Sequence, residues 1–247
     1  MQELPRLYAG MVRTFRSDLP FWRRLAIAVG GPVLELGSGT GRVAVDLAHH
    51  GLQVTGLDSD AGMLAWADQH RPPLPKGDLS YLQADITEFS LPVKFGLVVC
   101  PCNTLSLLSA EQAQRVLVNS RLHLRSAGVF AAELAHPRDV RFEAPDPTVP
   151  LAAFEDVVTG WPVQVFARQR FDARRQAADL EWILDELQPD GRVQRHTLQQ
   201  VVRLWAPEAI QEALRVAGFA GSCLLGGYQA ENYDEQSQRM LVVAVAP

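Results

Sequence analysis

The chain has 247 residues, of which 47% are hydrophobic and 21% are charged, a balance typical of a globular protein with a sizeable core. Its 23 basic and 28 acidic residues give a net charge of −5 without long runs of one sign, which disfavours a nucleic-acid-binding surface. No stretch approaches the roughly 20 apolar residues of a membrane helix, the N-terminus lacks a signal-peptide pattern, and three cysteines do not suggest a disulfide scaffold, so we expect a cytoplasmic protein.

Residues 1–30 place apolar side chains at helical spacing and predict two amphipathic helices separated at Asp18 and Pro20. From Gly31 the pattern changes to alternating strands and helices. Repeated strand–helix units on this rhythm predict a parallel sheet covered by helices on both faces. The predicted strands are 32–36, 53–57, 79–83, 95–100 and 128–134, and the predicted helices are 41–50, 60–70 and 110–125.

Past Pro137 this rhythm breaks at a proline-rich loop. Three β-like stretches follow, and the turn Pro189-Asp190-Gly191 separates the last two. We therefore expect an antiparallel meander over 137–205, inserted into a sheet domain that comprises 31–136 and 206–247. The remaining predicted elements are β-like stretches at 161–171, 178–187 and 193–205, a helix at 207–217, and strands at 222–225 and 240–245.

Three glycines at alternating positions follow the first predicted strand, in Glu35-Leu36-Gly37-Ser38-Gly39-Thr40-Gly41-Arg42. A strand, a glycine turn and a helix N-terminus form a cradle for a nucleotide-like ligand, because glycines admit the ligand to the main chain and the helix end presents free N–H groups. A nicotinamide dinucleotide fingerprint would need a glycine where Arg42 stands, and the Walker A ending is absent. The spacing therefore disfavours both rivals.

Acidic side chains stand at the ends of the first three predicted strands. Asp58 can accept hydrogen bonds from both hydroxyls of a ribose. Asp85 can accept from a purine amine while Ile86 offers its ring an apolar face, and Glu35 complements a cationic group. Asp58 and Asp85 could instead cap the helical turns that follow them. Together the three acids favour a ligand with adenine, ribose and a positively charged amino-acid tail.

At these residues the chain resembles the class I S-adenosylmethionine-dependent methyltransferases. Residues 35–41 are similar to the first motif of that family, 56–58 to its second-strand acid and 84–86 to its adenine-binding segment, while 100–105 sits where the fourth-strand loop passes the methyl donor. The resemblance implies an α/β fold, a Rossmann-like doubly wound sheet of seven strands with the last antiparallel. It also implies S-adenosylmethionine as cofactor and S-adenosylhomocysteine as product. The residues expected to hold the donor are Tyr8, Glu35, Gly37, Ser38, Gly39, Thr40, Gly41, Asp58, Ser59, Met63, Asp85, Ile86 and Cys100.

Cys100 and Cys102 invite a metal-binding interpretation. Two ligands one residue apart, with only Cys223 left over and no histidine close in sequence, do not form a zinc pattern. We therefore expect no metal, and small polarisable residues lining the donor pocket.

An N-terminal helical lid over 1–30 and an antiparallel insertion resemble the small-molecule N-methyltransferases that act on amino acids or amino sugars. We expect methyl transfer to a small-molecule acceptor, an amine more than a hydroxyl, with the inserted meander covering the acceptor site. Glu133 and His136 are the first catalytic candidates, because loops at the carboxyl ends of parallel strands ring the crevice. Arg168, Arg203 and Tyr228 are weaker candidates for the acceptor side.

Two other functions stay open. An aminopropyl transferase would use the decarboxylated donor in the same cradle, but the chain shows no Asp-rich acceptor loop. A non-catalytic S-adenosylmethionine-binding regulatory protein would keep the same donor residues. We expect no nucleic-acid or membrane partner, and a homodimer is left open.

Overall fold

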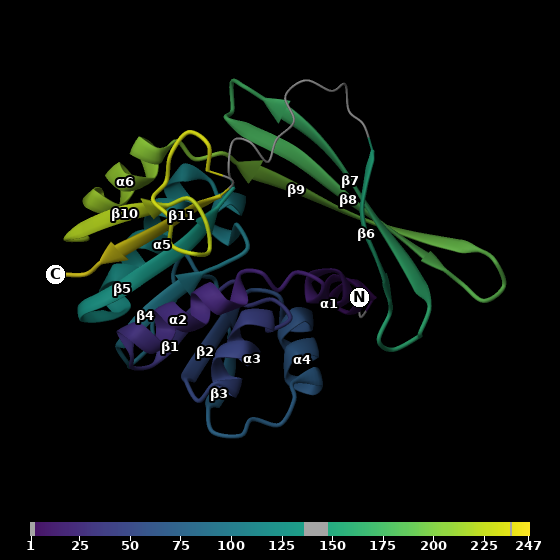
Figure 1. Ribbon diagram of the computed structural model, residues 1–247, viewed down its shortest axis with the longest axis horizontal. Helices are drawn as coiled ribbons and strands as arrows, with labels where there is room; N and C mark the ends of the chain where they lie inside the picture. The colour runs from purple at the N-terminus through teal and green to yellow at the C-terminus, as the bar shows by residue number, and fades with distance from the viewer. Residues whose placement is uncertain (1–2, 136–147, 238) are drawn as a thin grey trace.

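The computed structural model describes residues 3–135, 148–237 and 239–247, arranged around a seven-stranded and a four-stranded sheet (Figure 1). Among the described residues, no helix is both long and apolar enough to cross a membrane. The strands of the larger sheet are β1 (Val33–Leu36), β2 (Gln53–Asp58), β3 (Asp78–Gln83), β4 (Phe95–Cys100), β5 (Leu124–Leu134), β10 (Gly221–Leu225) and β11 (Met240–Val245).

The larger sheet has the strand order β10-β11-β5-β4-β1-β2-β3. Strands β1 to β5 pair in parallel, and β11 runs antiparallel to both of its neighbours. This confirms the predicted doubly wound sheet with an antiparallel last strand. The strand order reverses between β1 and β4, both buried along their whole length, so the carboxyl ends of these two strands border the ligand crevice expected of such sheets.

Alternating side chains of the central strands pack against helices on opposite faces of the sheet. Val33 and Leu97 pack toward α2 (Leu19–Val29) and α3 (Arg42–His49), with α4 (Ala61–His70) beside α3 (Figure 1). Leu34 and Val98 pack on the other face, against α5 (Ala110–His123) and α6 (Pro207–Val216). Two hydrophobic layers therefore hold the sheet rigid beneath the crevice.

The helix predicted over 110–125 ends at His123, because β5 begins at Leu124 rather than at Gly128. The early part of β5 pairs irregularly with β4, where the register shifts between Phe95 and Leu97. Ala127 adopts a positive φ of 56°, which fits this local irregularity. The polar segment before Gly128 thus looks like a turn in sequence although it belongs to the strand.

The predicted antiparallel insertion is confirmed, but it has four strands rather than three. The additional strand, β6, contains Pro150 and changes register between Pro150 and Ala152. An edge strand tolerates both features, and both conceal it from sequence patterns. The meander consists of β6 (Val149–Glu155), β7 (Pro162–Asp172), β8 (Ala177–Leu187) and β9 (Val193–Arg203), paired in that order.

The first helix, α1 (Glu3–Arg13), packs on the inserted sheet. Leu7 is fully buried against Val163, Val165 and Leu184. A Cβ atom added to Gly10 would lie 2.2 Å from the ring of Phe154, so the helix approaches the sheet as closely as glycine allows. We call α1 together with β6–β9 the cap.

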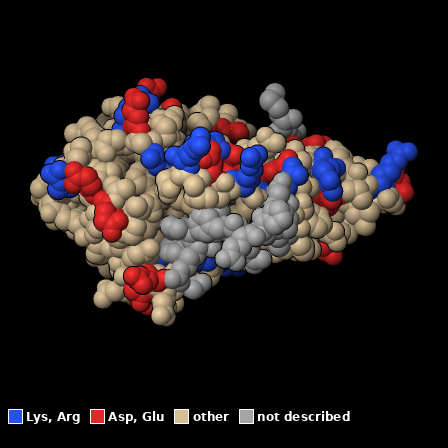
Figure 2. All heavy atoms as spheres, turned by 90° about the horizontal axis from the view of Figure 1, so that it is seen from above, with Lys and Arg blue, Asp and Glu red and all other residues tan. Residues whose placement is uncertain are grey.

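The face of the inserted sheet that points away from α1 carries cross-strand ion pairs. Arg168 pairs with Glu181 across β7 and β8, and Arg195 pairs with Asp185 across β8 and β9. Figure 2 shows basic and acidic side chains interspersed over the described part of the face in view. These pairs place Arg168 on a solvated surface, away from α1.

Candidate functional site

The glycine loop joins β1 to α3 at the carboxyl edge of the larger sheet. Gly37, Gly39 and Gly41 have φ angles of 70°, 52° and 81°, in the region that favours glycine. A Cβ atom at Gly37 would lie 2.4 Å from Thr104 Cγ2, and one at Gly41 would lie 2.1 Å from Tyr81 Oη. The loop therefore depends on glycine at 37 and 41, where neighbouring side chains leave no room for a Cβ atom, while Gly39 has only Tyr8 near it.

Asp58 ends β2, and its half-buried carboxylate braces the glycine loop. Its Oδ2 accepts a hydrogen bond of 2.8 Å from the N–H of Gly39, and its Oδ1 accepts one of 2.9 Å from the N–H of Asp60. Each oxygen can accept a second hydrogen bond, so capacity for a ligand hydroxyl remains. The N-cap of α4 is Asp60, which accepts from the N–H groups of Gly62 and Met63.

Glu35 is buried below the glycine loop and has a perturbed carboxyl group. Burial raises its pKa to about 8, although Arg42 and the N–H of Ala44 oppose the rise. Its Oε2 has no hydrogen-bond partner among the described residues, and neither has the buried hydroxyl of Ser38 or Tyr81. A buried carboxyl oxygen without a partner fits a ligand that brings a positive charge.

Tyr8 and Cys100 border the same region from different elements. A Cβ atom at Gly39 would lie 3.6 Å from Tyr8 Cε1, which places this side chain of the cap on the glycine loop. Burial raises the pKa of Tyr8, and the charges of Cys102 and Asp58 add to the rise. Burial also raises the pKa of Cys100 to about 12 at the end of β4, so its thiol is neutral. Neither group is a charged reactant at neutral pH.

Asp85 follows β3 and is exposed. Its Oδ1 accepts a hydrogen bond of 2.8 Å from the N–H of Thr87, and hydrogen bonds from Thr87 hold the pKa of Asp85 below its usual value. Asp85 therefore caps a turn while one carboxylate oxygen stays available. Ile86 packs in the core layer that faces α5 and α6, Ser59 is exposed, and Met63 is half-buried in the first turn of α4.

Arg42 has a role that sequence reasoning missed. Its two terminal nitrogens bind the carboxylate of Asp18 at 2.6 and 2.7 Å, and they also donate to the carbonyl of Phe15 and to Cys102 Sγ, each at 2.9 Å. Asp18 is completely buried. Arg42 is the first residue of α3, directly after the glycine loop. Its guanidinium thus anchors the segment between α1 and α2 at this point. No local sequence signal indicates this pairing.

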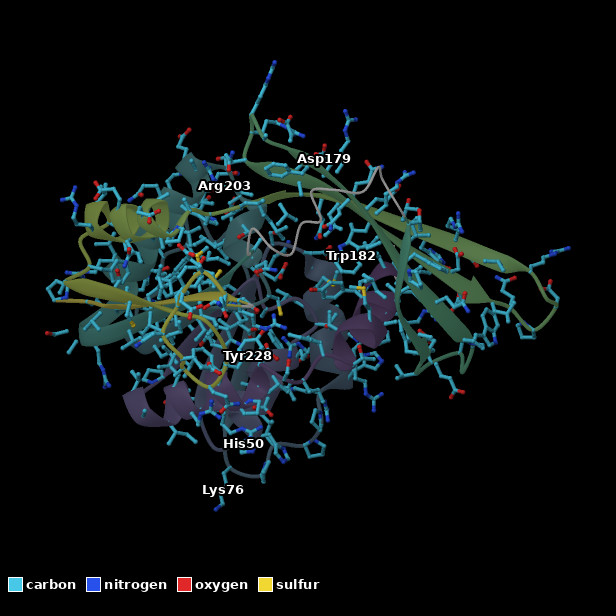
Figure 3. All side chains as sticks on the ribbon, turned by 45° about the horizontal axis from the view of Figure 1, so that its top comes forward. His50, Lys76, Asp179, Trp182, Arg203 and Tyr228 are labelled. Atoms are coloured by element: carbon cyan, nitrogen blue, oxygen red, sulfur yellow. The ribbon has the colours of Figure 1, made fainter. Side chains whose placement is uncertain are left out.

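Glu133, a predicted catalytic residue, lies buried in β5 near its carboxyl end. Its Oε1 accepts hydrogen bonds from Tyr228 Oη at 2.5 Å and from Arg239 Nη1 at 3.0 Å. Burial raises the pKa of Glu133, while its two partners oppose the rise. Tyr228, labelled in Figure 3, comes from the segment between β10 and β11. The other candidate, His136, lies outside the described residues.

Two remaining candidates do not join this constellation. Arg168 is engaged on the outer face of the inserted sheet, and Arg203 lies over the ring of Trp205, 5.2 Å from its centroid. Within the described ranges, no group of three histidine, cysteine, aspartate or glutamate side chains is arranged to hold a metal ion.

A buried ionic cluster fixes α1 to the inserted sheet. Arg6 Nη1 lies 2.8 Å from both Asp156 Oδ1 and Glu186 Oε1, and all three side chains are at most 10% exposed. Tyr8 belongs to the same helix as Arg6. The cluster that holds α1 on the inserted sheet therefore also holds the helix that carries Tyr8 to the glycine loop.

Residues 33–128 match the family model described as a methyltransferase domain. A protein of Bacillus subtilis (strain 168), whose name designates it a candidate methyltransferase, is 31% identical over 110 residues. That match covers 42% of this chain and 44% of the relative. The chain thus matches less than half the length of this curated relative.

Two solved structures have a similar fold over nearly the whole chain. An S-adenosylmethionine-dependent methyltransferase from Clostridium acetobutylicum has a TM-score of 0.80 at 13% identity, covering 99% of this chain and 98% of that one. A sugar N-methyltransferase from a Streptoalloteichus species has a TM-score of 0.75 at 20% identity, covering 97% and 91%. At these identities the likeness shows the fold, cap included.

Proposed function

We propose that this chain, which belongs to the class I S-adenosylmethionine-dependent methyltransferases, transfers the methyl group of S-adenosylmethionine to an amine of a small molecule. One observation carries the proposal: a loop that requires glycine, held by Asp58 through the N–H of Gly39, lies next to the unpartnered buried carboxyl oxygen of Glu35. A carboxylate that can still accept from ribose hydroxyls and a buried acid for a cation match an adenosyl amino acid.

The donor-binding roles follow from these positions. Residues 37–41 would hold the amino-acid portion through their main chain, Asp58 the ribose, and Asp85 with Met63 the adenine, while Glu35 balances the positive charge. When bound, S-adenosylmethionine supplies a methyl group on a sulfonium sulfur that leaves as the neutral thioether of S-adenosylhomocysteine. Tyr8 and Cys100 would close the site against water, which helps to align the reacting groups.

An amine acceptor must attack in its neutral form, so a nearby side chain that accepts the ammonium proton would assist the step. Glu133 lies near the carboxyl end of β5, and burial raises its pKa, which favours the form that can exchange a proton. Tyr228 and Arg239 hold its orientation. The amine assignment is supported by the similar fold of the Streptoalloteichus sugar N-methyltransferase. We place the acceptor beneath the cap, next to Glu133.

Calorimetry with S-adenosylmethionine, S-adenosylhomocysteine and NAD tests the donor assignment. We expect micromolar binding of both sulfur ligands and no comparable binding of NAD. Binding of NAD alone would overturn the proposal. A clear preference for the decarboxylated donor would favour aminopropyl transfer, and donor binding without methyl transfer to any of a panel of small amines would favour a regulatory protein.

Asp58→Ala is expected to weaken S-adenosylhomocysteine binding roughly 30-fold, because charge-assisted hydrogen bonds contribute about 2 kcal/mol. The same change removes the brace on the N–H of Gly39. Asp60→Ala is the matched control, since that exposed carboxylate caps α4 and has no assigned ligand. Calorimetry at one temperature measures both variants, with circular dichroism as the check on folding. Equal affinities for Asp58→Ala and the native protein would remove Asp58 from the site.

A further inference from the structure

A cavity of about 660 Å³ lies where α1, α3 and α4 meet. One face of each helix lines it, and Val157 and Val158 of the turn between β6 and β7 complete its rim. It borders Thr40, Gly41 and Arg42 at the end of the glycine loop, but neither Asp58 nor Asp85 lines it. The cavity therefore meets the proposed donor site only at Thr40 and Gly41, and it lies at the interface between the cap and the larger domain.

Apolar side chains form much of its wall. Val12 of α1, Val45 of α3 and Trp66 of α4 line it. Trp66 stacks on His70 with ring centroids 3.6 Å apart and ring planes 15° apart, which fixes the orientation of the indole. Val157 and Val158 remain 50% and 59% exposed. A pocket of this size and apolar character at a seam between two units is typical of a small-molecule site.

The charges that line the cavity are unbalanced. Arg13 and Arg16 are exposed, and their side chains have no hydrogen-bond or ion-pair partner within the described ranges. The acidic residue in the lining, Asp46, is paired with Arg23 at 2.8 Å. Arg42 is likewise neutralised, by Asp18. Two unpaired arginines in the lining of a largely apolar cavity complement a carboxylate, sulfonate or phosphate group.

We propose that this cavity binds a small amphipathic organic anion, with a planar ring toward Trp66 and its acidic group at Arg13 and Arg16. The walls come from the cap on one side and from the helices that follow the glycine loop on the other. An occupant would therefore hold the cap against the domain that carries Arg42. This site goes beyond the proposed methyl transfer and does not depend on it.

Fluorescence titration with anilinonaphthalene sulfonate, an aromatic anion that carries a planar naphthalene ring, tests the site directly. We expect one saturable site per chain, with the same affinity in the presence and absence of S-adenosylhomocysteine. Arg13→Gln with Arg16→Gln is expected to weaken the binding about tenfold, because charge-assisted hydrogen bonds are lost. The control pair is Arg174→Gln with Arg192→Gln, two exposed arginines on the turns of the inserted sheet, and it should leave the affinity unchanged.

Two further probes examine the apolar wall and the charge. Trp66→Leu should weaken the binding of the anion without changing the affinity for S-adenosylhomocysteine measured by calorimetry. Uncharged phenylnaphthylamine should bind equally to the native protein and to the Arg13/Arg16 variant.

Displacement of the dye by S-adenosylhomocysteine would assign the dye to the donor site and overturn the inference. Equal losses in the test and control pairs, or binding that does not saturate, would also overturn it. A protein that fails to bind S-adenosylhomocysteine but keeps the dye site would refute only the proposed function.

Discussion

Arg6→Met is expected to cost about 3–5 kcal/mol of folding free energy, because it leaves two buried carboxylates without their shared cation. Arg6 lies 2.8 Å from both Asp156 and Glu186, and the two carboxylates are at most 2% exposed. Their mutual repulsion and burial then act against the contact between α1 and the inserted sheet. Urea denaturation, followed by tryptophan fluorescence, measures the loss.

Two control variants separate this cause from a general loss of packing. Arg195→Met breaks a solvated pair on the outer face of the same sheet, where Arg195 is 60% exposed, and should cost below about 1 kcal/mol. Combining Arg6→Met with Asp156→Asn and Glu186→Gln removes the buried charges together, so most of the loss should be recovered. A triple variant as unstable as Arg6→Met would attribute the effect to the shape of the arginine instead.

The cap adds a spatial test to the same variant. Hydrogen exchange in Arg6→Met should rise together in α1 and in β6–β9, while β1 and β4 stay protected by both core layers. Because Tyr8 rests on the glycine loop from α1, S-adenosylhomocysteine should also bind more weakly. Faster exchange in α1 alone would show that the helix moves independently of the inserted sheet.

The central sheet was predictable because its signals are local. Residues 33–36 and 95–100 are short apolar runs that become strands buried on both faces. The glycine loop was equally readable, since positive φ at alternate residues demands glycine in the sequence itself. The position of Asp58 beside the glycine loop was predictable from these two features. Strands β1 and β2 are parallel, so their carboxyl ends lie at the same edge of the sheet.

The ionic contacts were not predictable, because each joins segments that only the tertiary fold brings together. Arg42 and Asp18 are 24 residues apart, and Arg6 and Glu186 are 180 apart. Nothing in the pattern around an arginine specifies its partner at such separations. Arg42, the residue that disfavours a dinucleotide site, binds Asp18 and the carbonyl of Phe15 and so anchors the N-terminal segment.

The affinity for S-adenosylhomocysteine is expected to rise about 100-fold between about pH 5.5 and pH 7.5, through the carboxyl of Glu35. Burial raises the pKa of Glu35 to about 8, so the free protein holds this group mostly protonated across that range. A ligand ammonium group favours the ionised form, so binding must release the proton. That release becomes about tenfold easier with each pH unit, and the ligand amine itself stays charged in this window.

Glu35→Gln is the decisive variant, because it copies the protonated side chain at every pH. Its affinity should match the native protein near pH 5.5, lack the rise toward pH 7.5, and release no proton in calorimetry with two buffers of different ionisation enthalpy. Glu133→Gln is the matched control: that carboxyl also has a raised pKa, but it lies near the end of β5, where we propose that the acceptor binds. It should keep the native slope. A slope that disappears in Glu133→Gln and persists in Glu35→Gln would transfer the cation-binding role to Glu133.

The same group makes the stability of the free protein depend on pH in an unusual direction for a carboxylate. Between its ordinary pKa of 4.5 and the raised value of about 8, the folded state binds more protons than the unfolded state. Stability therefore falls as pH rises through this window, by up to about tenfold in the unfolding equilibrium per pH unit. Glu35→Gln should be the more stable protein at pH 8 and lose its advantage near pH 5. The ammonium group of bound S-adenosylhomocysteine offsets the free-energy cost of burying the ionised Glu35 carboxylate. That cost is largest at the alkaline end of the window, so the ligand should stabilise the native protein most there.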